Sequence, residues 1–217
     1  MECVHWLTNK YSRAVHHRFV CATSKQTKGI KRFRSYQLAG ELDLGNPTIV
    51  DAARATSAAT SFFESVTIGA REYADGALVA NNPVNEVESE ASNLWCPQTG
   101  NLKSLVKCFI SVGTGKPAKK GFDDAPRAIV QALKDLTTET ENTAREFIDR
   151  WRQHYDENRY FRFNVDQGLQ NVGLAEYRDR ATIEAATEEY FNQLETKSKV
   201  RSCVQNLEGK ICMFDPT

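Results

Sequence analysis

The sequence has no excess of charge of either sign and no long apolar run. Lys plus Arg and Asp plus Glu each number 28, so the formal net charge is zero and no nucleic acid or other polyelectrolyte partner is implied. No stretch approaches the roughly 20 apolar residues of a membrane-spanning helix, and residues 1–19 lack the apolar segment of a signal peptide. We therefore expect a cytoplasmic protein whose contact with membranes, if it has any, is peripheral.

The motifs of metal, redox and nucleotide-cofactor sites are also missing. No two of the six cysteines form a C-x-x-C pair, and the four histidines show no H-x-H, H-x-x-H or H-E-x-x-H spacing. No G-x-G-x-x-G follows a strand, and "SVGTGKP" fails as a phosphate-binding loop because Ile110 and Pro117 occupy required positions. We expect no metal, no cofactor and reduced thiols, with Cys21 and Cys108 in buried strands.

The composition is that of an ordinary globular protein, with 41% hydrophobic and 26% charged residues in a chain of 217. Strand and helix signals alternate over residues 18–113, which indicates an α/β fold with a parallel or mixed sheet. The expected strands are residues 18–23, 65–69, 71–76 and 102–115, the last of them long enough for the middle of a sheet.

Two segments of this first half carry the residue pattern of a helix N-terminus. In "GNPTIVDAARATSAAT", Asn46 is a candidate N-cap and Pro47 fits the first helical position. In "ANNPVNEVESEASNLW", Asn82 and Pro83 repeat that pattern. The face of the first helix expected to pack on the sheet consists of Ile49, Ala53 and Thr56.

The segment 24–37 is basic and rich in turn residues. Charge runs on neutral proteins are usually solvated, so a surface loop is the expectation, and a patch that binds phosphate or lipid headgroups is the alternative. Its basic residues are Lys25, Lys28, Lys31, Arg32 and Arg34.

From residue 117 onward the pattern is mainly helical, so we expect one domain over 1–116 and a helical extension packed on it over 117–217. Residues 159–164 alternate like a strand, and one long amphipathic helix is predicted near the end of the chain. The inward-facing residues expected on the helices are Ala144, Phe147, Ile148, Trp151 and Tyr155, then Ile183, Ala186, Tyr190 and Leu194.

The stretch "YADGALVANNP", residues 73–83, raises the question of chemistry. An Asp-Gly pair is among the commonest turn signals. Asp75, however, ends a predicted strand, and α/β folds usually build their sites at strand ends. Spacing alone leaves both readings open, a turn or a catalytic carboxylate.

The succession "AARATSAATSFFESVTIG…YADGALVANNPVNEVESEA…CFISVGTG" closely resembles the second half of a patatin-like phospholipase domain, most like the fungal multidomain branch. The tail "TETENTAREFIDRW…YFRFNVDQGLQNVGLAEY" resembles the helical segment that follows it there. The likeness covers roughly residues 18–205. It implies part of a three-layer α/β/α fold, with residues 1–116 as the C-terminal portion of the domain.

The resemblance also implies an activity. Patatin-like enzymes are lipid acyl hydrolases with a Ser-Asp dyad, and their substrates are membrane lipids or acylglycerols. Asp75 matches the dyad carboxylate, which accepts the serine proton, and Gly76 and Ala77 complete its motif. Gly76 lets the chain turn tightly. In the same family the residues matching Asn81, Asn82 and Pro83 fix the loop and start the next helix.

Three departures from the family pattern stand out. Ala77 and Thr60 replace a common Gly and a common Pro, and neither change removes a reacting group. More severely, no G-x-S-x-G occurs anywhere, although the family carries its nucleophile there, after a Gly-rich oxyanion loop. Ser57 and Ser111 are poor substitutes, the first in an Ala-rich helix and the second inside a strand. We expect that this chain alone does not hydrolyse esters.

The missing nucleophile leaves three explanations. The first is a fragment of a longer patatin-like hydrolase, and it is the one we favour. The second is a shortened, non-catalytic interaction or regulatory module whose helical tail contacts a protein partner. The third is a partner that supplies the missing half. In each case we expect an unpaired sheet edge and an exposed apolar face.

Overall fold

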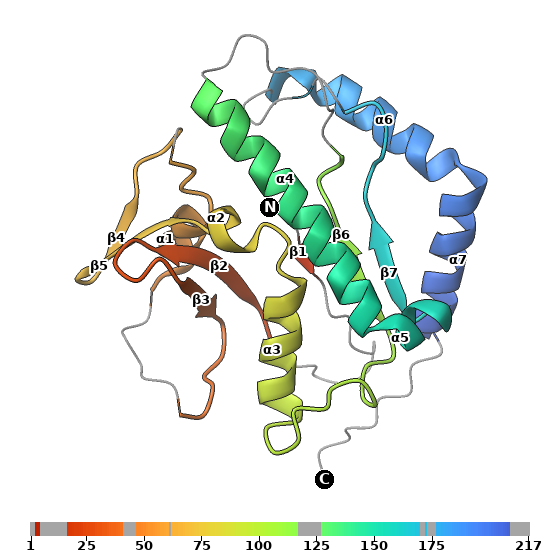
Figure 1. Ribbon diagram of the computed structural model, residues 1–217, viewed down its shortest axis with the longest axis horizontal. Helices are drawn as coiled ribbons and strands as arrows, with labels where there is room; N and C mark the ends of the chain where they lie inside the picture. Colours follow the sequence, from red (N-terminus) through yellow and green to blue (C-terminus); the bar gives the residue numbers. More distant parts are fainter. Residues whose placement is uncertain are drawn as a thin grey trace.

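The computed structural model describes residues 3–4, 17–40, 47–60, 62–116, 127–169, 172 and 177–208. Figure 1 shows the arrangement of its elements. The strands are β1 (Cys3–Val4), β2 (Phe19–Ser24), β3 (Ile30–Arg34), β4 (Val66–Ile68), β5 (Arg71–Asp75), β6 (Phe109–Val112) and β7 (Tyr160–Phe163). The helices are α1 (Ile49–Thr56), α2 (Ala77–Ala80), α3 (Val84–Trp95), α4 (Arg127–Arg150), α5 (Arg152–Asp156), α6 (Arg180–Asn192) and α7 (Leu194–Glu208), with a 3-10 turn η1 (Tyr177–Asp179).

The strands form two sheets. One is antiparallel with the order β3-β2-β5-β4, and the other has the order β1-β6-β7, in which β6 and β7 run parallel. The predicted α/β class with a helical C-terminal part is confirmed. β6 lies in the middle of its sheet as expected, but it is only four residues long. Residues 102–106 turn rather than extend, and their apolar side chains Leu102 and Val106 are buried without strand pairing.

Helix α1 covers the antiparallel sheet. It begins at Ile49 with a capping box in which the Thr48 hydroxyl accepts from the Asp51 amide, so Thr48, not Pro47, directly precedes the helix. The predicted cap Asn46 lies outside the described residues. Ile49, predicted to be buried, is 89% exposed, and the buried residues of the helix are Ala55 and Thr56. Ala53 is also exposed, and the core under α1 consists of Ala22, Phe33, Ala55, Ala58, Val66 and Tyr73.

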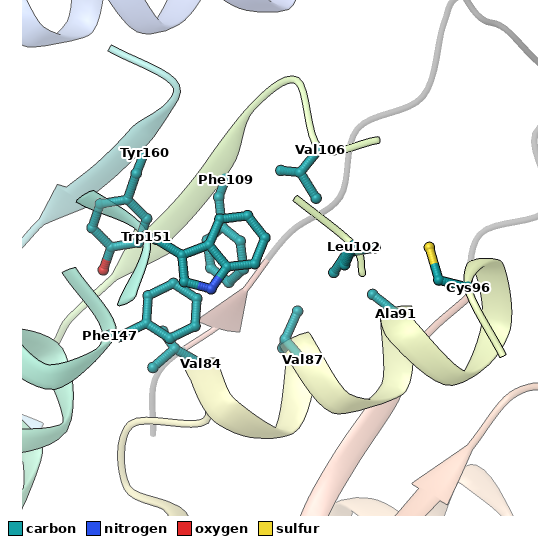
Figure 2. Packing of buried hydrophobic residues seen from close by; sticks show 10 residues of the cluster. All are labelled: Val84, Val87, Ala91, Cys96, Leu102, Val106, Phe109, Phe147, Trp151 and Tyr160. Atoms are coloured by element: carbon teal, nitrogen blue, oxygen red, sulfur yellow. The ribbon is translucent and has the colours of Figure 1, made fainter. Parts of the chain in front are cut away.

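A larger aromatic core joins α3 to the C-terminal half (Figure 2). Trp151 and Phe147 stack at a centroid distance of 5.5 Å, and Phe109 of β6 packs against both. The indole Nε1 of Trp151 donates to Glu88 of α3 at 2.8 Å. Other members of this core are Val84, Val87, Ala91, Cys96, Leu102, Val106 and Tyr160. The prediction that Phe147 and Trp151 face inward is confirmed, whereas Tyr155 is exposed.

The C-terminal segment differs from its prediction in the division of its last helix and in the exposure of Ile183, which was predicted to face inward and is 38% exposed. Strand β7 is present as expected, but the long helix predicted near the end is two helices. The chain is extended at Gln193, which has a ψ of 139°, so α6 ends there and α7 starts at Leu194. The break turns Leu194 outward, where it is 79% exposed, while Ala186 and Tyr190 stay buried.

Only part of the basic segment is a solvated loop: residues 25–29, which include Lys25 and Lys28, form an exposed turn. Residues 30–34 form β3, and its two arginines reach across to carboxylates of α3. Arg32 Nε donates to Glu86 Oε2 at 2.7 Å, and Arg34 Nη2 donates to Glu90 Oε1 at 2.6 Å. The charge run is therefore the anchor of α3 on the edge of the antiparallel sheet.

Candidate active site

The main chain of Asp75 is held on three sides at the end of β5. Asp75 is in register with Ala22 of β2. Its amide donates to the carbonyl of Ala58 at 3.0 Å, and its carbonyl accepts from the Thr23 hydroxyl at 2.7 Å. The strand end is thus fixed both to the neighbouring strand and to the chain that follows α1, and a side chain placed there has a defined direction.

The carboxylate of Asp75 is half-buried, and one of its oxygens is bound. Oδ1 accepts from the backbone amide of Ala77 at 2.8 Å. Among the described residues no Lys, Arg or His forms an ion pair with this carboxylate. The second carboxylate oxygen of Asp75, Oδ2, therefore remains available to another hydrogen-bond donor, which is the arrangement that proton transfer requires.

Gly76 has a different role from the one expected. Its φ is −64°, a value that any residue adopts, so the turn itself does not require glycine. A Cβ at this position would lie 2.2 Å from the carbonyl oxygen of Cys21, which also accepts a hydrogen bond from the Thr56 hydroxyl at 2.6 Å. Glycine is required because the chain passes directly against β2.

A short helix follows the motif at once. α2 begins at Ala77, and the amide of Ala80 donates to the carbonyl of Gly76 at 2.8 Å. Asn82 does not cap α3: that helix starts at Val84, and Pro83, predicted at the first helical position, occupies the cap position without a side-chain hydrogen bond. The extra turn of α2 has rotated the Asn82 side chain away from the end of α3.

Both asparagines of the loop face α4 instead. Asn81 Nδ2 donates to the hydroxyl of Thr140 at 2.6 Å, and Asn82 Nδ2 is 3.4 Å from the carbonyl oxygen of Thr140. Asn82 is buried, and its Oδ1 lacks a hydrogen-bond partner within the described part of the chain. Sequence reasoning missed Thr140, because a Thr within a helical pattern carries no signal of a contact with residues 59 positions away.

Glu90 is the second residue that the sequence did not reveal. It lies in α3, is almost fully buried, and accepts from Arg32, Arg34 and Tyr36. Burial alone would raise the pKa of Glu90, but the hydrogen bonds from Arg34 and Tyr36 and the charges of both arginines lower it below its ordinary value. The group is structural, because all of these partners come from β3 and the residues after it.

Neither alternative serine contacts Asp75. The Ser57 hydroxyl donates to the carbonyl of Ala53 at 2.8 Å, back along α1. Ser111 is fully buried in β6 and accepts from Arg162 at 2.8 Å. Ser57 is the C-cap residue directly after α1, the helix in which it was predicted, and Ser111 lies inside a strand as predicted.

The described residues contain neither a cluster of metal-ligating side chains nor a helix that could span a membrane. In that part of the chain no three His, Cys, Asp or Glu side chains gather closely enough to hold a metal ion. None of its helices combines the length and the apolar character needed to cross a bilayer. Cys21, whose carbonyl group and Cβ lie against Gly76, is buried, and the burial of its thiol, followed by the negative charge of Glu86, raises the pKa of that thiol to about 12.

Part of this chain is similar in sequence to known proteins. Residues 5–87, which include Asp75 and the loop up to Pro83, match the family model described as patatin-like phospholipase. The protein called phospholipase A I of Arabidopsis thaliana is 29% identical over 149 residues, which is 64% of this chain and 10% of that protein. The chain thus spans about a tenth of the length of this curated relative. Residues 5–87 are thus similar to part of a patatin-like domain.

Proposed function

We propose that the chain is part of a lipid acyl hydrolase in which Asp75 is the proton acceptor of a Ser-Asp dyad. The observation that carries the proposal is the state of the Asp75 carboxylate. It ends β5 inside the stretch that matches the family, it is oriented by the Ala77 amide at 2.8 Å, and no cation of the described residues neutralises it. A buried structural carboxylate such as Glu90 differs on the last point.

The proposed chemistry uses the two oxygens of Asp75 differently. The Ala77 amide holds Oδ1, so Oδ2 accepts the proton of a serine hydroxyl as the serine oxygen bonds to the ester carbon. The same proton then passes to the leaving alkoxide as the ester C–O bond breaks, and water repeats the two steps on the acyl-enzyme. No G-x-S-x-G occurs in these 217 residues, so the serine is to be sought in sequence beyond them.

A lipid ester is the proposed substrate class, and the support for it is the match of residues 5–87 to the patatin-like phospholipase model. Phosphatidylcholine vesicles and trioleoylglycerol emulsions present the two sources of such esters, a membrane and an acylglycerol droplet.

The test uses the protein expressed from its complete gene. Fatty-acid release from both lipid preparations is measured for the wild type, for Asp75→Asn and for Asp51→Asn, a control carboxylate at the start of α1. Asp75→Asn is expected to lower kcat by a factor on the order of 10²–10⁴ with an unchanged Tm, because amide nitrogen cannot accept the proton. Asp51→Asn is expected to retain activity. Full activity of Asp75→Asn would show that the assigned role is wrong.

A non-catalytic interaction module is the second candidate. It is favoured by the exposed apolar side chains of the C-terminal helices, Ile183, Phe191, Leu194 and Val204. This reading requires that the 217-residue chain fold on its own, because a module must be stable without the rest of a catalytic domain. A soluble product with a single cooperative thermal transition supports it, and an aggregated product counts against it.

A further inference from the structure

We propose that Thr140 of α4 is a positioning residue for Asp75, acting through the asparagines that follow α2. The proposal rests on the proposed function in that Asp75 is taken as the dyad carboxylate. Thr140 lies well outside residues 5–87, the stretch that matches the patatin-like family. The part of the chain after the matched stretch would therefore contribute to the geometry of the site.

Two hydrogen bonds join the loop to Thr140 of α4. The Thr140 hydroxyl accepts from Asn81 at 2.6 Å, and the Thr140 carbonyl is the partner of Asn82 at 3.4 Å. Thr140 and Asn82 are both buried. Hydrogen bonds between buried groups are lost only at the full cost of desolvation, so this contact is far more persistent than one at the surface.

The direction of the Thr140 hydroxyl is set within its own helix. Its proton goes to the carbonyl of Leu136 at 2.8 Å, one turn earlier, so its lone pairs face the Asn81 amide. Serine preserves this donor and acceptor pair. Valine has nearly the same shape as threonine but offers neither, and it would leave the Asn81 amide without its partner.

The link from Asn81 back to Asp75 is a single helical turn. α2 joins the two, and its hydrogen bond from Ala80 to Gly76 at 2.8 Å closes that turn. The first residue of the turn, Ala77, donates to Asp75 Oδ1. A shift of Asn81 is therefore passed along four residues to the amide that orients the carboxylate.

α4 also contacts the sheet of β1, β6 and β7, through the residue next to Thr140. Glu141 follows Thr140 in the chain, and its Oε1 lies 3.9 Å from Nη2 of Arg162 in β7. The same oxygen accepts from Nδ2 of Asn164, which follows β7, at 3.5 Å. α4 runs across the molecule between α2 and the β6–β7 pair (Figure 1). The segment of residues 75–83, called the Asp75 loop, is thus bound to a residue of α4 whose neighbour Glu141 contacts the C-terminal half of the chain.

The variants separate this role from a general loss of stability. Thr140→Val removes the hydroxyl and Thr140→Ser restores it. Thr187→Val is the matched control, because the Thr187 hydroxyl in α6 donates to the carbonyl of Ile183 one turn back at 2.7 Å, and Thr187 forms no hydrogen bond with the described residues 75–83. Asn81→Ala breaks the same hydrogen bond from the other partner and replaces Thr140→Val if that variant does not fold.

Two local readouts need no catalysis, and both are made on the protein expressed from its complete gene. The first is hydrogen exchange of the Ala77 amide, and the second is the rate of iodoacetamide alkylation at Cys21, a buried cysteine whose carbonyl group and Cβ lie against Gly76. Thr140→Val and Asn81→Ala are expected to speed both by about three- to tenfold, the equivalent of one lost hydrogen bond. Thr140→Ser and Thr187→Val are expected to match the wild type.

Hydrolysis provides the third readout. Thr140→Val is expected to lower kcat on phosphatidylcholine vesicles by about three- to tenfold with little change in KM, and Thr140→Ser to restore it, because the loop orients the base and does not bind lipid. If the wild type hydrolyses no lipid, the proposed function fails, and exchange and alkylation still decide the positioning role. Wild-type exchange at Ala77 in both Thr140→Val and Asn81→Ala would overturn the inference.

Discussion

The guanidinium of Arg34 in β3 forms a buried ion pair with the carboxylate of Glu90 in α3. The two side chains are 8% and 2% exposed, and Arg34 Nη2 lies 2.6 Å from Glu90 Oε1. Tyr36 adds a hydroxyl to the same carboxylate at 2.7 Å. These contacts join the edge of the antiparallel sheet to the helix that follows the Asp75 loop, so the position of that helix depends on them.

Removing one partner of this pair should be strongly destabilising. Glu90→Ala leaves the Arg34 charge buried without its carboxylate, and we expect the free energy of unfolding in urea to fall by about 3–5 kcal/mol. Glu184→Ala is the control, since its pair with Arg180 in α6 is exposed and helix pairs of this kind contribute about 0.3–0.5 kcal/mol. Equal losses in the two variants would contradict the role assigned to Glu90.

Acid should weaken the same contact. The pKa of Glu90 is lower in the folded protein than its ordinary value of 4.5, so the unfolded chain binds this proton more tightly. The stabilisation is therefore complete above 4.5 and is lost as the pH falls through the lower, folded pKa. As the pH falls from 4.5 to the folded pKa, we expect the free energy of unfolding to decline less steeply in Glu90→Gln than in the wild type. Equal slopes would contradict the assignment.

The close approach at Gly76 predicts a steric effect. In Gly76→Ala the new methyl group would meet the Cys21 carbonyl at 2.2 Å, and backbone on both sides must move. We expect the free energy of unfolding to fall by about 1–3 kcal/mol or more, as in other overpacked sites. Gly29→Ala is the matched control, because its methyl group would lie 3.5 Å from the Thr27 side chain. A Gly76→Ala protein as stable as the control would refute the close packing.

The capping box of α1 predicts a smaller effect on the same measurement. The Thr48 hydroxyl accepts from the Asp51 amide at 3.1 Å, and the Asp51 carboxylate accepts from the Thr48 amide at 3.0 Å. Thr48→Ala should lower the free energy of unfolding by about 0.5–2 kcal/mol, and Thr48→Ser should remain near the wild type. If alanine and serine behave alike, the cap is not formed by this hydroxyl.

Local patterns predicted much of the fold near Asp75. The strand ending at Asp75, the turn before it at Gly69, the strand over residues 159–164 and the buried pair Phe147 and Trp151 all rest on short-range periodicity. The helix ends were less predictable. An Asn-Pro pair is compatible with an N-cap, but at Asn82 a tertiary contact with α4 takes the side chain instead.

The contacts that position the site are long-range, and this is why the sequence did not reveal them. Arg32 and Glu90 are 58 residues apart, so the basic segment looked like a solvated loop until its carboxylate partners were known. Thr140 likewise shows no signal until α4 is placed beside the Asp75 loop. The role of Gly76 was likewise not predictable from local sequence, because glycine is required there by the close approach of β2 and not by the turn.

Labelling with a fluorophosphonate shows without any lipid substrate whether Asp75 activates a serine, because the reagent reacts with an activated serine hydroxyl. In the protein expressed from its complete gene, we expect a single labelled serine, with labelling slowed by a factor on the order of 10²–10⁴ in Asp75→Asn and unchanged in Asp51→Asn. Labelling of Asp75→Asn at the wild-type rate, or no labelling of the wild type, would contradict this role of Asp75.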